Sequence, residues 1–162
     1  ALLLPFLFES IVYPLIVTGV ILLVILLARV KHTFHGFSKP GKLSEIWYGL
    51  SAVICIAAAW NIDPWLAVTP ILIMSWADGA VELVGRAFYH KVEHKGVAGT
   101  VAMAVLSMGI GAAALNPVWI GIAGGAVATI AERLGNGGVR DDNLLVPLAV
   151  LALIVPLYLF WG

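Results

Sequence analysis

Charged residues are scarce in this sequence, since Lys, Arg, Asp and Glu make up only 11% of its 162 residues. Soluble domains carry about 25% charged and about 45–50% apolar residues, whereas this chain is 62% apolar. Its mean hydropathy is +1.04. This composition excludes a soluble globular domain, a nucleic-acid-binding protein and a disordered chain. The sequence therefore predicts a membrane protein with no nucleic-acid partner.

Cysteine and strand-like alternation are also lacking. The single cysteine, Cys55, cannot form an internal disulfide, so cysteine usage does not indicate a redox compartment. Strands of a membrane β-barrel alternate apolar and polar residues with a period of two, and no segment here does so. A cleavable signal peptide is not expected, because residues 1–10 contain no basic region. An α-helical membrane protein is the class that remains.

Uncharged runs of about bilayer length separate the charges. Crossing a bilayer needs roughly 20 apolar residues, and the longest run, 96–131, is divided by the turn signal Asn116-Pro117. In lipid each span must satisfy its own backbone hydrogen bonds. We therefore expect one all-α integral membrane domain over residues 1–162, a polytopic bundle with helices near 11–29, 44–61, 64–86, 98–115, 117–134 and 144–161.

The basic residues lie in alternate loops of this bundle. All nine Lys and Arg fall in the first, third and fifth connections, and the opposite side carries only Glu9 and Asp63. Because cytoplasmic loops are enriched in Lys and Arg, the basic side is predicted to be cytoplasmic. Both termini are then non-cytoplasmic, and chemistry is expected at the cytoplasmic face.

The predicted helix 64–86 contains two carboxylates, Asp78 and Glu82. A carboxylate near the centre of a span costs about 2.5–3.5 kcal/mol on insertion scales. Ser75 and Gly85 extend the same face, because residues three and four apart lie on one side of a helix. We expect this face to look into the bundle or into a wet pocket near its cytoplasmic end. The alternative is a pair that snorkels at the membrane boundary.

A stripe of small residues on the predicted helix 117–134 ends at another carboxylate. Gly121, Gly125, Ala128 and Glu132 share one face. The Gly-x-x-x-Gly spacing lets a neighbouring helix approach closely, so the stripe serves either internal packing or a homodimer. It also brings Glu132 to the cytoplasmic level of the bundle.

Two loops on the basic side carry further candidates. Lys95 precedes Gly99 and Thr100 at a helix start, where backbone N–H groups, a hydroxyl and a nearby Lys form an anion site. The alternative is a solvated basic loop. The run 141–143, Asp-Asp-Asn, is either an N-cap or a source of the oxygen ligands that Mg²⁺ prefers. Together with the carboxylates, these features indicate a nucleotide–Mg²⁺ site.

Histidine pairs offer a less favoured metal site. His32 and His35 are three residues apart, and His90 and His94 are four apart, so each pair could share a helical face. Neither an HExxH motif nor a cysteine partner accompanies them.

The order and spacing of the motifs resemble the phytol kinase/dolichol kinase family, which is related to the phosphatidate cytidylyltransferase superfamily. Members are integral membrane enzymes that use CTP to phosphorylate a lipid alcohol. The resemblance runs from about residue 45 to about residue 147. It is carried by Glu45–Gly49, Asp78-Gly79, Glu82–Arg86, Lys95 with Gly99-Thr100, Ala131-Glu132, and Asp142-Asn143 with Val146-Pro147.

One motif departs from the family pattern. The family carries a basic pair followed by His on an early helix, and the nearest match here is Val30-Lys31-His32. Either this segment is a diverged form of that motif, or an N-terminal helix is missing from this chain.

The resemblance implies a CTP-dependent lipid alcohol kinase with Mg²⁺ as cofactor, acting on phytol, geranylgeraniol, dolichol or a similar isoprenoid. Its partners are then CTP, the lipid alcohol and the bilayer. We expect Asp78 or Glu82 to accept the proton of the lipid hydroxyl, and Lys95 to act with them in catalysis. Metal ligands are expected to be Asp78, Glu132 and Asp142. The expected nucleotide-binding residues are Gly85, Arg86, Lys95, Gly99, Thr100 and Asn143.

Two alternatives stay open. One is a CTP-dependent lipid enzyme of the phosphatidate cytidylyltransferase type. The other is a small ion- or proton-coupled transporter that uses Asp78, Glu82 and Glu132 as its path. Transport is disfavoured because these carboxylates cluster near one membrane face and the sequence shows no inverted repeat.

Overall fold

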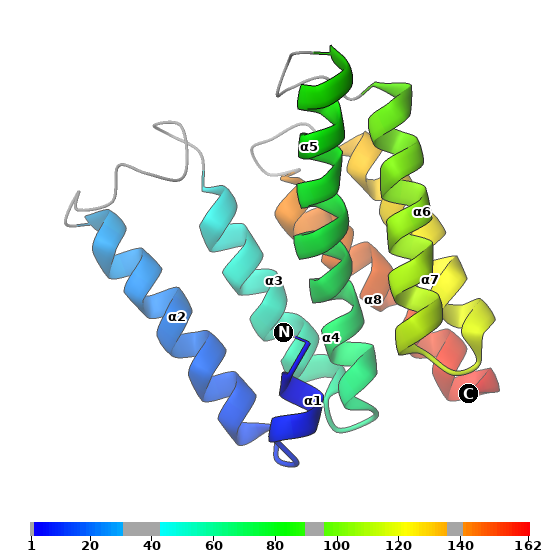
Figure 1. Ribbon diagram of the computed structural model, residues 1–162. Coiled ribbons are helices and arrows are strands. Elements are labelled where there is room, and N and C mark those ends of the chain that lie inside the picture. Colours follow the sequence, from blue (N-terminus) through cyan, green and yellow to red (C-terminus); the bar gives the residue numbers. More distant parts are fainter. Residues whose placement is uncertain (1, 31–42, 90–95, 136–140) are drawn as a thin grey trace.

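The computed structural model describes residues 2–30, 43–89, 96–135 and 141–162, and helices are the regular secondary structure of these ranges (Figure 1). The prediction of an all-α chain is confirmed there. A helical stretch occupies each of the six expected ranges, whereas the short first helix and the π-helical turn within the range 64–86 were not predicted. The elements are α1 (Leu4–Leu7), α2 (Val12–Val30), α3 (Ser44–Ala59), α4 (Pro64–Leu72), the π-helical η1 (Ile73–Ala77), α5 (Asp78–Tyr89), α6 (Val97–Ala114), α7 (Val118–Leu134) and α8 (Asp142–Trp161).

Within the described ranges, four stretches are long and apolar enough to cross a membrane, namely Val12–Arg29, Pro64–Gly85, Val97–Ala114 and Asp142–Trp161. The remaining long helices, α3 and α7, have 16 and 17 residues. Only 6% of the α2 stretch is buried, although it is almost wholly apolar. Such an outward-facing apolar surface suits a protein whose surroundings are lipid.

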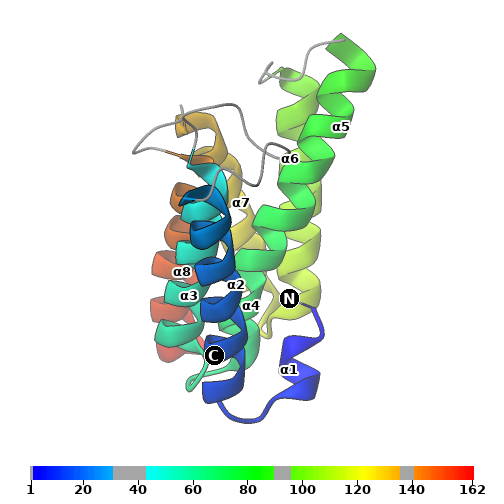
Figure 2. The same ribbon diagram turned by 90° about the vertical axis from the view of Figure 1, so that its left-hand side faces the viewer.

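The long helices run alternately in opposite directions, so the bundle has two ends (Figures 1 and 2). Helices α2, α5 and α7 finish at one end of the bundle, and α3, α6 and α8 begin there. We call it the charged end, and it carries Arg29, Glu45, Glu132, Arg133, Asp141 and Asp142. The opposite end is called the aromatic end, and it carries Phe6, Trp65, Trp119, Tyr158 and Trp161.

The centre of the bundle is α4, whose residues from Leu66 to Leu72 are all buried. Asp63 caps this helix and Pro64 occupies its first position, where a missing N–H costs nothing. Pro70 lies inside the helix, and the π-helical η1 follows soon after it. Proline removes one backbone hydrogen bond, and π-helical turns occur frequently at functional sites. Asp78 is the first residue after this irregular turn.

The predicted small-residue stripe packs against α6. A methyl group added to Gly111 of α6 would overlap the backbone of Gly121 of α7, and the reverse also holds. Gly125 lies equally close to the backbone of α6, and its carbonyl oxygen accepts a hydrogen bond from Ser107 Oγ at 2.9 Å. Of the two uses predicted for this stripe, the structure shows internal packing.

Candidate functional site

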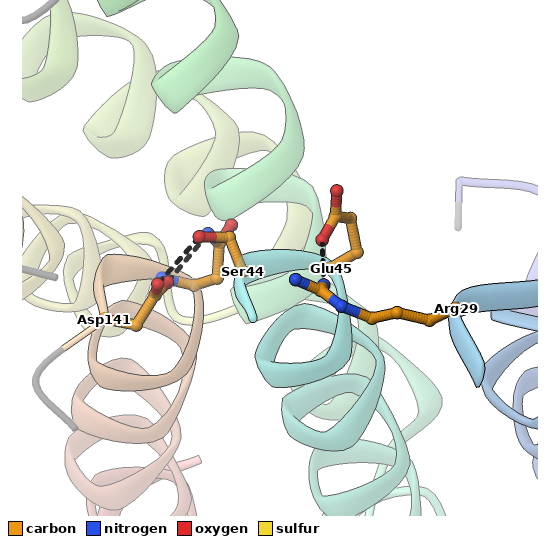
Figure 3. A network of polar contacts seen from close by, with 5 residues as sticks. Arg29, Ser44, Glu45 and Asp141 are labelled. Carbon is orange, nitrogen blue, oxygen red and sulfur yellow. Dashed lines mark hydrogen bonds and ion pairs between the residues drawn. The ribbon is translucent and has the colours of Figure 1, made fainter. Parts of the chain in front are cut away.

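A buried aspartate joins two helix starts at the charged end (Figure 3). Asp141 is 5% exposed and caps α8. Its Oδ1 accepts hydrogen bonds from the backbone N of Asn143 at 3.0 Å and from Asn143 Nδ2 at 2.8 Å. Its Oδ2 accepts a hydrogen bond from Ser44 Oγ at 2.8 Å, across 97 residues of sequence. Asp141 therefore ties the start of α8 to the start of α3.

Two further contacts hold the same region together. Ser51 Oγ lies 2.9 Å from the carbonyl oxygen of Asn143 and 2.8 Å from that of Tyr48, so it links α3 to α8. Arg29 Nη1 lies 3.2 Å from Glu45 Oε2 (Figure 3), which links the end of α2 to the start of α3. Three helix ends are thus fixed to one another beside the candidate residues Asp142 and Asn143.

The height of Asp78 in the bundle follows from a contact between α3 and η1. Tyr48, one helical turn after Ser44, lies beside Ser75 of η1. From this contact α3 runs away from the charged end, whereas η1 and α5 run towards it (Figure 1). Asp78 follows Ser75 by almost a turn, so it lies within about one turn of the height of Ser44. Glu82 lies one turn farther out.

The face predicted to hold Ser75, Asp78, Glu82 and Gly85 is not uniformly buried. Gly85 is buried and Asp78 is half-buried, whereas Ser75 and Glu82 are exposed. The face of α5 that packs against α6 contains Val81, which lies next to Gly99. Asp78 and Glu82 lie beside this packed face. Ser75 belongs to the π-helical turn, whose register differs from that of α5. The carboxylates are therefore reachable from outside the bundle and are not sealed inside it.

The other two candidate carboxylates lie where α7 ends and α8 begins. Glu132 is 4% exposed in the last turn of α7. Asp142 is half-buried at the start of α8, and its carboxylate lies so close to Gly135 that a methyl group there would overlap it. The η1 segment packs against α6, α7 and α8. It therefore connects the Asp78 region with the helices that carry Glu132 and Asp142.

The start of α6 fits the predicted anion site in part. Its N-cap is Gly96, which has no side chain to accept hydrogen bonds from the first-turn amides. Gly99 is buried against α5, where an added methyl group would come within 3.2 Å of Val81 Cγ1. Thr100 Oγ1 donates a hydrogen bond to the Gly96 carbonyl oxygen at 3.3 Å. The small residue at position 99 therefore also lets α6 pack closely on α5.

Several predicted residues are not placed by the structure. Lys95, and the histidine pairs His32/His35 and His90/His94, lie outside the described residues. Arg86 belongs to α5, directly after Gly85.

Among the described residues, no three Asp, Glu, His or Cys side chains gather as a ready metal cluster. Asp78, Glu132 and Asp142 approach the same end of the bundle from separate elements. Mg²⁺ usually takes one or two carboxylates and completes its shell with water and substrate phosphates. The donor set therefore fits Mg²⁺ brought in with a nucleotide better than a metal held by the protein alone.

The capping role of Asp141 was one of two alternatives predicted from the sequence, whereas the contacts of Ser44, Ser51 and Tyr48 were not predicted. Ser44 and Ser51 are ordinary polar positions of a predicted span, and Tyr48 was noted only as part of the segment Glu45–Gly49. Only their distance in space from Asp141, Asn143 and Ser75 reveals their contacts. A comparison of the chain with family models, curated proteins and solved structures found no match.

Proposed function

We propose that this chain is a CTP- and Mg²⁺-dependent kinase that transfers the γ-phosphate to the hydroxyl of a membrane lipid alcohol, such as phytol, geranylgeraniol or dolichol. One observation carries the proposal. Carboxylates from η1–α5, from the end of α7 and from the start of α8 belong to one end of the bundle, where the resemblance to the phytol kinase/dolichol kinase family assigns nucleotide chemistry.

Phosphoryl transfer requires the reacting atoms to be in line and the charge on the phosphates to be neutralised. The lipid oxygen forms a bond to the γ-phosphorus, the bond from that phosphorus to the β–γ bridging oxygen breaks, and CDP leaves. The hydroxyl proton passes to the carboxylate of Asp78 or Glu82. The exposed position of Glu82 and the half-buried position of Asp78 leave both accessible to a substrate that arrives from the bilayer boundary.

Mg²⁺ would be held by Asp78 with Glu132 or Asp142, and when bound it neutralises charge on the CTP phosphates. Gly99 and Thr100 at the start of α6, Arg86 at the end of α5, and Lys95 between them would cradle the phosphates. Gly85 allows α5 to approach the nucleotide closely, and Asn143 contacts it from α8. The hydrocarbon tail of the alcohol stays in the bilayer between helices.

The proposal includes a membrane orientation. Six helical stretches cross the bilayer, both termini are non-cytoplasmic, and the charged end faces the cytoplasm, where CTP is found. Arg133 lies in the last turn of α7, at the charged end, and Asn61 lies between α3 and α4, at the aromatic end; both residues are exposed. Single cysteines at these positions can therefore report orientation.

In a Cys55→Ala background, an impermeant thiol reagent applied from the non-cytoplasmic side should label Asn61→Cys and spare Arg133→Cys. Reagent applied to inverted vesicles should give the opposite result. Labelling of both cysteines from one side would contradict the six-span topology.

The activity is tested by label transfer on purified protein in detergent, with Mg²⁺, a panel of lipid alcohols, and phosphatidate. Parallel reactions contain CTP labelled at the α- or at the γ-phosphate. Movement of the γ label to an alcohol is expected and begins to identify the substrate. Movement of the α label to phosphatidate would replace the kinase by a cytidylyltransferase. Transfer of neither label would overturn both.

A further inference from the structure

We infer that Asp141 and Ser44 form a latch that positions Asn143 as a hydrogen-bond acceptor for the nucleotide. The inference rests on the proposed function and assigns positioning roles to two residues that do not themselves touch substrate. It starts from the orientation of one side-chain amide.

The Asn143 amide has a definite orientation. Asp141 accepts from Asn143 Nδ2 at 2.8 Å, and a carboxylate oxygen accepts hydrogen bonds from an NH₂ group but repels a carbonyl oxygen. Nδ2 therefore faces Asp141, and Oδ1 occupies the opposite side of the amide group. Asn143 thus presents an oxygen, which accepts a hydrogen bond from an N–H or O–H group of a nucleotide base or ribose.

The orientation of Asp141 is set in turn by α3. One carboxylate oxygen of Asp141 is occupied by Asn143, and the other accepts from Ser44 Oγ at 2.8 Å. The carboxylate is 5% exposed, so water does not compete strongly for these hydrogen bonds. The Asn143 backbone is held as well, because its carbonyl oxygen accepts from Ser51 Oγ at 2.9 Å. Side chains from α3 therefore fix both the backbone and, through Asp141, the amide of Asn143.

A purely structural cap would have the same hydrogen bonds without affecting substrate binding, and the chain contains such a cap. Asp63 caps α4 by accepting from the backbone N of Trp65 at 2.8 Å, and it accepts from the hydroxyl of Tyr158 at 2.9 Å. It lies at the aromatic end, away from the candidate site. Asp63→Ala and Tyr158→Phe are therefore matched controls for Asp141→Ala and Ser44→Ala.

The test compares kcat and the KM for CTP of these variants and of Asn143→Ala, at a saturating concentration of an alcohol substrate. Asp141→Ala and Asn143→Ala should each raise the KM for CTP about tenfold, the value of one hydrogen bond at the strong end of the usual range, with a smaller change in kcat. Ser44→Ala should raise it about threefold. The double variant Asp141→Ala/Asn143→Ala should bind CTP no worse than Asn143→Ala alone, because the two residues act as one unit.

Asp141→Asn retains an acceptor oxygen for Asn143 and a good N-cap, so it should keep the KM within about threefold of the wild-type value. The control variants should leave the KM unchanged. If Asp141→Ala does not fold, Ser44→Ala decides, because it removes one hydroxyl only.

An unchanged KM in Asp141→Ala or Ser44→Ala, a change equal to that of the Asp63→Ala and Tyr158→Phe controls, or multiplicative effects in the double variant would overturn the latch. Wild-type protein that turns over CTP while the variants behave like the controls contradicts the latch alone. Wild-type protein that neither binds CTP in equilibrium titration nor transfers its phosphate contradicts the latch and the proposed function together.

Discussion

The two ends of the bundle contain the same capping arrangement in different surroundings. Asp63 and Asp141 each use one oxygen to cap a helix and the other to accept a hydroxyl hydrogen bond from a second helix. Around Asp63 the neighbours are aromatic, as in the edge-to-face pair of Phe6 and Trp65 with ring centroids 5.5 Å apart. Such residues are typical anchors at a membrane interface.

Around Asp141 the neighbours are ionisable. Glu132 lies at the end of α7 and Asp142 at the start of α8. Asp78 begins α5, directly after η1, which packs against α7 and α8. The comparison teaches that a buried, fully hydrogen-bonded aspartate does not by itself indicate a functional end. The proposed site at the charged end rests instead on the further carboxylates that separate helices bring there, since each is costly in a membrane.

The largest expected effect is a difference in activity between substitutions of two aspartates, Asp78 near the charged end and Asp63 at the aromatic end. Asp78→Asn should lower phosphate transfer by about a thousandfold, because it removes a charge that acts on the reacting groups. Asp63→Asn should leave the rate unchanged, since Asn also caps helices well. Both variants should elute as folded protein in gel filtration. Full activity of Asp78→Asn would remove this residue from the site.

The next effect tests packing near the aromatic end. Gly111→Ala should destabilise the protein by about 3 kcal/mol, because the added methyl group meets the backbone of α7, which cannot move aside easily. Gly109→Ala on the same helix has open space around it and should be neutral or stabilising by about 0.5–1 kcal/mol. Thermal unfolding in detergent measures both. Equal stability of the two variants would contradict the close α6–α7 contact.

A similar substitution at the charged end should affect activity instead. The backbone of Gly135 has φ −67° and ψ 136°, which alanine adopts freely. Its added methyl group meets the carboxylate of Asp142, a side-chain end that can rotate away. Gly135→Ala should therefore keep its unfolding temperature but lose about tenfold in activity, the value of one displaced hydrogen bond at the strong end of the usual range. Unchanged activity would show that the position of Asp142 is unimportant.

The smallest effect concerns the Arg29–Glu45 ion pair. Its side chains are 32% and 30% exposed, and exposed ion pairs contribute about 0–1 kcal/mol. Arg29→Gln should therefore change the unfolding temperature only slightly and more at low salt than at high salt. A large destabilisation would mean that α2, which packs on α3, depends on this contact for its position.

Much of the helical layout could be predicted because the bilayer imposes it. Runs such as 10–28 and 144–162 must form helices that satisfy their own backbone, and α2 and α8 begin and end close to the expected positions. The π-helical turn before Asp78 could not be predicted, since no residue pattern distinguishes its register from that of an α-helix. The short α1 was missed because it is defined by its packing on α4.

The candidate residues were selected from the sequence by a similar physical argument. Carboxylates inside a span are visible in a sequence because they oppose its hydropathy, which is why Asp78, Glu82 and Glu132 could be selected. Their different burial could not be foreseen, since it depends on which side of α5 packs against α6.

The sequence by itself determined that this protein is helical, apolar on its outside and polar at one end, because hydropathy and charge act on each residue independently of its partners. The tertiary structure decided which small residues touch, that Gly111 meets Gly121, and that Ser44 holds Asp141 from 97 positions away. Those contacts depend on the relative placement of helices, and short-range patterns in a chain carry no record of distance in space.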